Sequence, residues 1–214
     1  RILFVGIPTG MENGMFQAGK LTVLNLITTF GTAAVAANAI ANSVASVINV
    51  PGQAISLALV TVMGRCMGAR DTQQAVHYTK RLLGTAYLCM FVMGTSLFFM
   101  AGRLVTLFNL RQEAMLSAAQ LLRMFAVFNI FFWPVSFVLP NALRAAGDAV
   151  FTMVVSLCSM FACRVALSYV LACSWGLGLG LQGVWLAMFC DWVIRSTCFV
   201  IRFWQGRWKR IQVI

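Results

Sequence analysis

The chain has 214 residues, of which 61% are hydrophobic and 10% are charged, with 16 Lys and Arg against 5 Asp and Glu. Soluble domains carry about 45–50% apolar and about 25% charged residues, so this composition argues against a water-soluble enzyme. The formal charge of +11 does not indicate nucleic-acid binding, because the basic residues stand singly between apolar runs. The composition is typical of a protein embedded in a lipid bilayer.

Glycines, prolines and charges divide the sequence into six apolar segments. A transmembrane helix needs about 20 such residues. The predicted spans are residues 2–30, 33–62, 82–101, 114–139, 149–173 and 181–203. Polar connectors are expected at 64–81, 102–113, 141–148 and 174–180, followed by a basic, aromatic tail at 204–214. We therefore predict an all-α integral membrane protein with six transmembrane helices.

Loop charges predict the topology of these spans, because Lys and Arg concentrate on the cytoplasmic side of short loops. If the N-terminus is cytoplasmic, only Arg103 and Arg111 lie outside. The basic residues then on the inner side are Arg1, Arg65, Arg70, Lys80, Arg81, Arg144, Arg202, Arg207, Lys209 and Arg210. Both ends are thus predicted to be cytoplasmic. We find no signal-peptide pattern and expect the chain to be a part of a longer membrane protein.

Two acidic residues lie within predicted spans, where a charge costs at least ~2.5 kcal/mol at the centre of the bilayer. Glu12 is a candidate for proton or cation coupling, although it could instead lie at the interface near the start of its span. Asp191 and Arg195 are four residues apart, a spacing that predicts a structural ion pair on one helix face. Lys20 lies in the middle of its span and is expected to face a cavity.

The second span carries a row of amides, Asn38, Asn42, Asn49 and Gln53. Their separations of 4, 7 and 4 residues place them on one helix face. Such a row either joins helices by hydrogen bonds or lines a wet substrate path, and the sequence favours neither. Pro51 in this span, and Pro134 and Pro140 in the fourth, are either tolerated or bend their helices around a cavity.

The sequence lacks the usual signs of an enzyme or an ATP-driven pump. His77 is the single histidine and lies in a connector, and no phosphate-binding loop with Lys and Ser or Thr is present. We therefore expect no catalytic residues, no metal site and no cofactor.

Four stretches resemble the multidrug and toxic-compound extrusion (MATE) transporters. They are Gly6-Ile7-Pro8 with Glu12 and Phe16, Gly64-x-x-x-Gly68-Ala69-Arg70-Asp71, Leu143-Arg144-Ala145-Ala146-Gly147-Asp148, and Gly176-x-Gly178-x-x-x-x-Gly183-Val184-Trp185. Each is weak alone, but four in order at suitable intervals are specific. Nearly the whole chain resembles the C-terminal half of such a transporter.

The resemblance implies one six-helix lobe of a twelve-helix antiporter, with the N-terminal lobe of the same protein as its partner. It implies efflux of small organic cations by exchange for Na⁺ or H⁺, in the plasma or inner membrane. Glu12 corresponds to the acid that many members have on the seventh helix. Where some members have a second acid, on the tenth helix, the fourth span offers only Asn129. Lys20, the amide row and Asn129 are the expected cavity-lining residues.

Three alternatives stay open. A lipid-precursor flippase of the related superfamily would use a more basic cavity, for which Lys20, Arg123, Arg164 and Arg195 are suited. A membrane scaffold without transport activity, or a channel subunit, is the second alternative, although a channel would need polar rows on several spans. A membrane enzyme is the least supported.

Overall fold

The computed structural model describes residues 2–108, 112–173 and 176–210, and these residues form helices and turns without a strand. They build six long helical segments, some of which contain a π-helical turn. The segments are α1 (Ile2–Thr28), α2 (Thr32–Gly68), α3 (Thr72–Thr106), α4 (Gln112–Trp133) with η1 (Pro134–Val138) and α5 (Leu139–Ala145), α6 (Ala149–Ser159) with η2 (Met160–Leu167) and α7 (Ser168–Ala172), and α8 (Gly180–Gln205). A short 3₁₀ helix, η3 (Arg207–Arg210), follows.

Five of these segments are long and apolar enough to cross a membrane: α2, α3, α4–α5, α6–α7 and α8. The 27 residues of α1 reach ~40 Å at the usual helical rise, which is also sufficient. Within α1, Glu12 and Lys20 are the charged residues. The architecture confirms the predicted fold class, an all-α membrane protein.

The helices extend beyond the predicted spans into the connector at 64–81. Only residues 69–71 separate α2 from α3 there, because Arg70 has a left-handed backbone (φ 57°) and Asp71 caps the next helix. The Asp71 side chain accepts a hydrogen bond of 2.9 Å from the backbone N–H of Gln74. Polar side chains such as those of Lys80 and Arg81 do not break a helix that leaves the apolar layer, so polarity alone overestimates the length of the connector.

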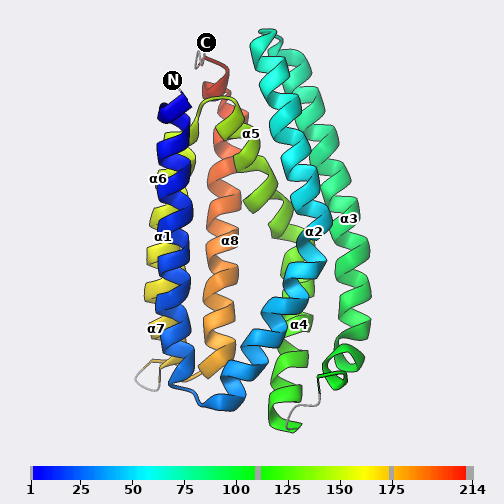
Figure 1. Cartoon of the computed structure of the whole chain (residues 1–214), viewed down its shortest axis with the longest axis vertical. Helices are drawn as coiled ribbons and strands as arrows, with labels where there is room; N and C mark the ends of the chain where they lie inside the picture. The colour runs from blue at the N-terminus through cyan, green and yellow to red at the C-terminus, as the bar shows by residue number, and fades with distance from the viewer. Residues whose placement is uncertain (1, 109–111, 174–175, 211–214) are drawn as a thin grey trace.

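The helices form two groups with a shared element between them (Figure 1). α2, α3 and α4 pack together on one side, whereas α1, α6–α7 and α8 pack together on the other. The segment from α4 through η1 to α5 crosses between the groups and contacts both. The start of α1 and the end of α8 lie at the same end of the molecule (Figure 1), so an even number of crossings separates them. Which end faces the cytoplasm stays a prediction from the loop charges.

Prolines lie where two of the long segments change direction. α2 continues through Pro51 and bends along its length. It starts near the end of α1, slants across the molecule and then runs beside α3 (Figure 1). Pro134 begins the π-helical turn η1, and Pro140 lies in α5, which slants across the molecule. Proline removes a backbone hydrogen bond and kinks a helix. The bends open space between the two groups.

An aromatic cluster joins α4 to α8 and closes one side of that space. The rings of Phe128 and Phe189 stack with their centroids 4.3 Å apart. Phe125 meets Trp185 and Trp192 edge to face, at 6.1 and 5.9 Å. Such pairs contribute about 0.5–1.5 kcal/mol beyond simple burial. The cluster therefore fixes the orientation of α8 and of the polar residues that this helix carries.

We predict that Gly183→Ala destabilises the α7–α8 hairpin. A Cβ at residue 183 would lie 2.8 Å from both the carbonyl carbon and the oxygen of Leu171, which are backbone atoms that cannot rotate away. We expect a cost of about 1–3 kcal/mol, measured as a lower thermal unfolding temperature in detergent. Gly64→Ala is the matched control, because a Cβ at that exposed helical position meets nothing within 4 Å. Equal stability of the two variants would contradict this close packing of α8 on α7.

Candidate substrate cavity

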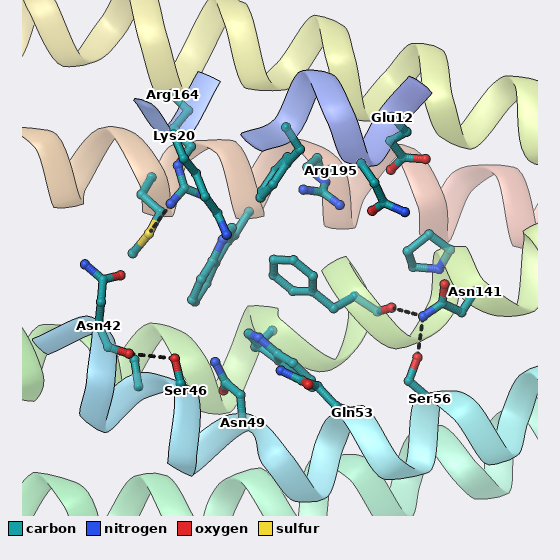
Figure 2. A pocket seen from close by; sticks show the side chains of 18 of the residues that line it. Glu12, Lys20, Asn42, Ser46, Asn49, Gln53, Ser56, Asn141, Arg164 and Arg195 are labelled. Carbon is teal, nitrogen blue, oxygen red and sulfur yellow. Dashed lines mark hydrogen bonds between the residues drawn. The ribbon is translucent and has the colours of Figure 1, made fainter. Parts of the chain in front are cut away.

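A cavity of about 470 Å³ lies between the two helix groups. Its walls come from α1, α2, the α4–η1–α5 segment, η2 and α8 (Figure 2). The aromatic side chains of Phe16, Phe125, Trp133, Phe137, Trp185 and Trp192 alternate with polar ones around it. Concave sites of this volume are typical of small-molecule binding, and more than half of the residues that line this one are polar or charged.

The amide row of α2 forms one wall of this cavity. Asn42, Asn49 and Gln53 line it together with Ser46 and Ser56. These side chains follow one another along α2 and face the opposite wall of α1 and α8 (Figure 2). Asn42, Asn49 and Gln53 therefore share one face of α2, as their spacing predicts, and this face lines the cavity.

Asn38, the fourth amide of the row, lies deeper. Its side-chain oxygen accepts a hydrogen bond of 3.1 Å from the indole N–H of Trp185 and another of 3.0 Å from the amide of Asn42. It lines a smaller adjoining cavity of about 210 Å³, which also borders Lys20 and Arg164. Asn38 thus joins α2 to α8, so the row both links helices and lines the cavity.

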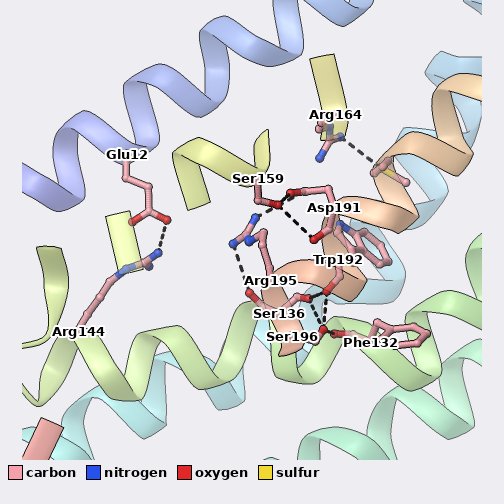
Figure 3. A network of polar contacts seen from close by, with 11 residues as sticks. Glu12, Phe132, Ser136, Arg144, Ser159, Arg164, Asp191, Trp192, Arg195 and Ser196 are labelled. Carbon is pink, nitrogen blue, oxygen red and sulfur yellow. Dashed lines mark hydrogen bonds and ion pairs between the residues drawn. The ribbon is translucent and has the colours of Figure 1, made fainter. Parts of the chain in front are cut away.

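Glu12 lies at the opposite end of the cavity from Lys20 and forms an ion pair with Arg144 (Figures 2 and 3). The distance from Glu12 Oε1 to Arg144 Nη2 is 2.5 Å, and the two side chains are 7% and 19% exposed. Arg144 also donates to Asn141 Oδ1 at 2.8 Å and to Thr152 Oγ1 at 3.3 Å. Glu12 therefore connects α1 to both α5 and α6.

The role of Arg144 was not predicted, because its sequence position suggested a cytoplasmic loop charge. The residue occupies the last turn of α5, beside the turn Leu143–Asp148. In the same turn, Gly147 takes a positive φ of 96° and Asp148 forms two hydrogen bonds with Arg202 of α8, of 2.7 and 3.1 Å. This turn ties α1, α6 and α8 together through two ion pairs.

Asp191 and Arg195 lie on one face of α8, with 3.9 Å between Asp191 Oδ2 and Arg195 Nη1. The Ser159 hydroxyl hydrogen-bonds to Asp191 Oδ1, and Arg195 donates at 3.3 Å to the carbonyl of Ser136 in η1 (Figure 3). Both side chains are at most 4% exposed. The i,i+4 spacing indicated this proximity, whereas the serines come from distant segments that spacing cannot reveal.

Asn129, an expected cavity-lining residue, lies in the helix interface instead. It is fully buried, and its amide donates to Met90 Sδ of α3 at 3.5 Å. The rotation of α4 about its axis turns this position toward α3 and turns Phe125 and Trp133 toward the cavity. Arg123, on the same helix, has an exposed side chain.

The cavity has no cluster of three or more His, Cys, Asp or Glu residues that could hold a metal ion, as far as the described residues show. Its charged side chains are Glu12, Lys20, Arg144, Arg164 and Arg195. Four of these five are basic, so the walls of this half carry an excess of positive charge.

The chain belongs to the MatE family, whose model matches residues 8–170. The chain is 26% identical over 213 residues to the probable multidrug resistance protein NorM of Thermotoga maritima, covering all of this chain and 45% of that relative. It therefore spans about half the length of the curated relatives it matches. A second relative, multidrug and toxin extrusion protein 2 of Oryctolagus cuniculus, is 27% identical over 202 residues, which cover 92% of this chain and 31% of that relative.

Solved structures of the family have the same fold. An outward-facing structure of a multidrug resistance MATE family transporter superposes with a TM-score of 0.85 at 18% identity, over 98% of this chain and 47% of that one. An inward-facing structure of such a transporter gives a TM-score of 0.79 at 18% identity, over 96% and 46%. The described helices thus match one half of a MATE transporter in both states.

Proposed function

We propose that this chain is the C-terminal lobe of a transporter that exports small organic molecules by antiport against Na⁺ or H⁺. The observation that carries the proposal is the cavity between the helix groups, which combines aromatic walls with a row of amides. Alternating access requires a site that opens to each side in turn. In support, the fold resembles solved family members in outward-facing and inward-facing conformations.

Glu12 is the coupling residue in this proposal. Its Oε1 accepts from Arg144, while its buried Oε2 has no hydrogen-bond partner within the described residues. A proton or Na⁺ on this carboxylate would weaken the Glu12–Arg144 pair and leave the mostly buried guanidinium without its counter-charge. Such a loss is costly in a place of low dielectric constant. Binding of the coupling ion would therefore favour a rearrangement of α5 relative to α1.

The N-terminal lobe and the lipid bilayer are the partners we propose for this chain, in the plasma or inner membrane with both ends cytoplasmic. Large apolar side chains that do not line the cavity are exposed on α3 and α4, for example Leu88, Phe91, Phe99 and Phe131. Exposed apolar side chains of this size and number require lipid or another protein to cover them. The relatives, which are about twice as long as this chain, have room for a second lobe.

The charge of the substrate separates two candidate functions. Organic cations, implied by the resemblance, need negative charge at the binding site, but Glu12 is already paired with Arg144 in this half. The flippase alternative requires basic residues, and Lys20, Arg164 and Arg195 line the cavity. The basic wall favours substrates with an anionic group, whereas cation transport would depend on acidic side chains supplied by the other lobe.

Gradient-driven transport by the full-length protein tests the proposed function. Vesicles that carry the protein are loaded with a fluorescent organic cation or, separately, a fluorescent organic anion, and a Na⁺ or a proton gradient is imposed. We expect efflux of one of the probes under one of the two gradients and none without a gradient. Folded protein that moves neither probe under either gradient would contradict the proposal and favour the scaffold alternative.

A further inference from the structure

Three cationic side chains surround the ring of Phe16 on the α1–α8 wall of the cavity. Lys20 Nζ lies 5.2 Å from the ring centroid, and the guanidinium carbons of Arg164 and Arg195 lie 5.3 and 5.7 Å from it. The three residues come from α1, η2 and α8, and Figure 2 shows them on the wall opposite the α2 row. Cation–π attraction helps to hold such groups at one ring. The fold thus concentrates positive charge in a small volume.

Carboxylates balance only part of this charge. Asp191 Oδ2 lies 3.9 Å from Arg195, and Glu12 pairs with Arg144 at the other end of the cavity. Around Phe16, three cations therefore face one carboxylate within the described part of the chain. Like charges gathered around one ring repel each other, most strongly where water is scarce. An anion bound between them would relieve that repulsion.

Arg195 has donors available for such an anion. Its side chain is 4% exposed, and within the described residues its Nε and Nη1 have no hydrogen-bond partner. Nη2 donates to the carbonyl of Ser136 at 3.3 Å, which fixes the orientation of the guanidinium. A buried donor without an acceptor is costly, and the planar guanidinium matches the two oxygens of a carboxylate or phosphate. Arg195 lines the cavity, but its Nε and Nη1 are covered by neighbouring groups, so an anion contacts them once those groups shift.

We propose that Lys20, Arg164 and Arg195 bind an oxyanion group, a carboxylate or a phosphate, of the transported molecule. The apolar part of that molecule would lie against Trp185 and Trp192, which line the same cavity. This inference rests on the proposed transport function and adds the chemical class of the substrate. A soluble aromatic acid and the headgroup of an anionic lipid both carry the required group.

A pair of matched probes tests the oxyanion site directly. The full-length transporter, in phosphatidylcholine nanodiscs, is titrated with 1-naphthoate and with the uncharged 1-naphthamide, and binding is followed by calorimetry. We expect the acid to bind at least about tenfold more tightly than the amide, as a charged hydrogen bond commonly provides. Lys20→Gln should remove most of this preference and Lys20→Arg should keep it. Lys20 is the best position to change because its side chain is exposed to the cavity, so its loss does not disturb the buried core.

Lys80→Gln is the matched control, since Lys80 is exposed on α3 and does not line the cavity. Equal affinity for acid and amide, or an unchanged preference in Lys20→Gln, would overturn the proposal.

A second titration, in nanodiscs that contain phosphatidic acid, separates the two sources of the oxyanion. Displacement of naphthoate by this lipid would indicate that the oxyanion belongs to a lipid headgroup. Unchanged naphthoate binding would indicate a soluble anion. Either result is consistent with the proposed oxyanion site. A protein that moves a probe under a gradient yet shows no acid preference refutes this inference alone, whereas acid binding without gradient-driven transport refutes the proposed function alone.

Discussion

Glu12→Gln in the full-length transporter is expected to reduce gradient-driven efflux by at least about tenfold while expression and folding are kept. The amide matches the carboxylate in shape and can still accept a hydrogen bond from Arg144, which lies 2.5 Å away. It cannot carry a charge or exchange a proton, so the pair no longer responds to the coupling ion. An intramembrane ionisable residue is a functional candidate for this reason. Transport rates of purified protein in vesicles, normalised to protein amount, measure the effect.

Two variants serve as controls for this result. Glu113→Gln removes an exposed carboxylate at the start of α4 and should leave efflux unchanged. Glu12→Asp keeps the charge on a shorter side chain and should retain part of the activity. Efflux by Glu12→Gln at the wild-type rate would remove Glu12 from the mechanism and transfer coupling to the N-terminal lobe.

Asp191→Asn should destabilise the protein more than Gly183→Ala does. The substitution leaves Arg195, at most 4% exposed, without the carboxylate that lies 3.9 Å away. Removing one partner of a buried pair costs about 3–5 kcal/mol, because the remaining charge is not solvated. We expect a clearly lower unfolding temperature in detergent, while the hydrogen bond to Ser159 can still form through the amide oxygen.

A double variant separates charge from packing at this position. Asp191→Asn combined with Arg195→Gln removes both charges and should recover part of the lost stability. Asp71→Asn, a change of the same kind at a partly exposed helix cap, should cost at most about 1 kcal/mol. If Asp191→Asn were no more destabilising than Asp71→Asn, the two buried charges would not stabilise each other.

The sequence alone predicted those features that depend on composition or on spacing within one helix. The hydrophobic content indicated the helical membrane fold, the 4-7-4 spacing placed Asn42, Asn49 and Gln53 on one face, and the i,i+4 spacing brought Asp191 near Arg195. These inferences need only the geometry of a single helix.

Contacts between distant helices could not be predicted in this way. Glu12 and Arg144 are separated by 132 positions, and nothing in either segment indicates the other. The rotation of α4 about its own axis could not be predicted either. Asn129 was expected to line the cavity, but it faces α3. The π-helical turns η1 and η2 add to this difficulty because they change the residue periodicity on which face assignments depend. Of the basic residues suited to a cavity, Arg164 of η2 lines it, whereas Arg123 of α4 does not.

The most direct test of a transport cavity is its accessibility from each side of the membrane. Asn49, which lines the cavity, is replaced by Cys in a full-length transporter whose natural cysteines are changed to Ala. A membrane-impermeant maleimide is then applied to either side of oriented vesicles, with and without Na⁺ and at two pH values. Leu88→Cys on the outer face of α3, where Leu88 is 63% exposed, is the control that should resist labelling because lipid covers it. We expect residue 49 to be labelled from one side in one ionic condition and from the other side in another. Labelling from both sides at once would indicate a channel, and labelling from neither side would indicate a closed scaffold. Either result would contradict alternating access through this cavity.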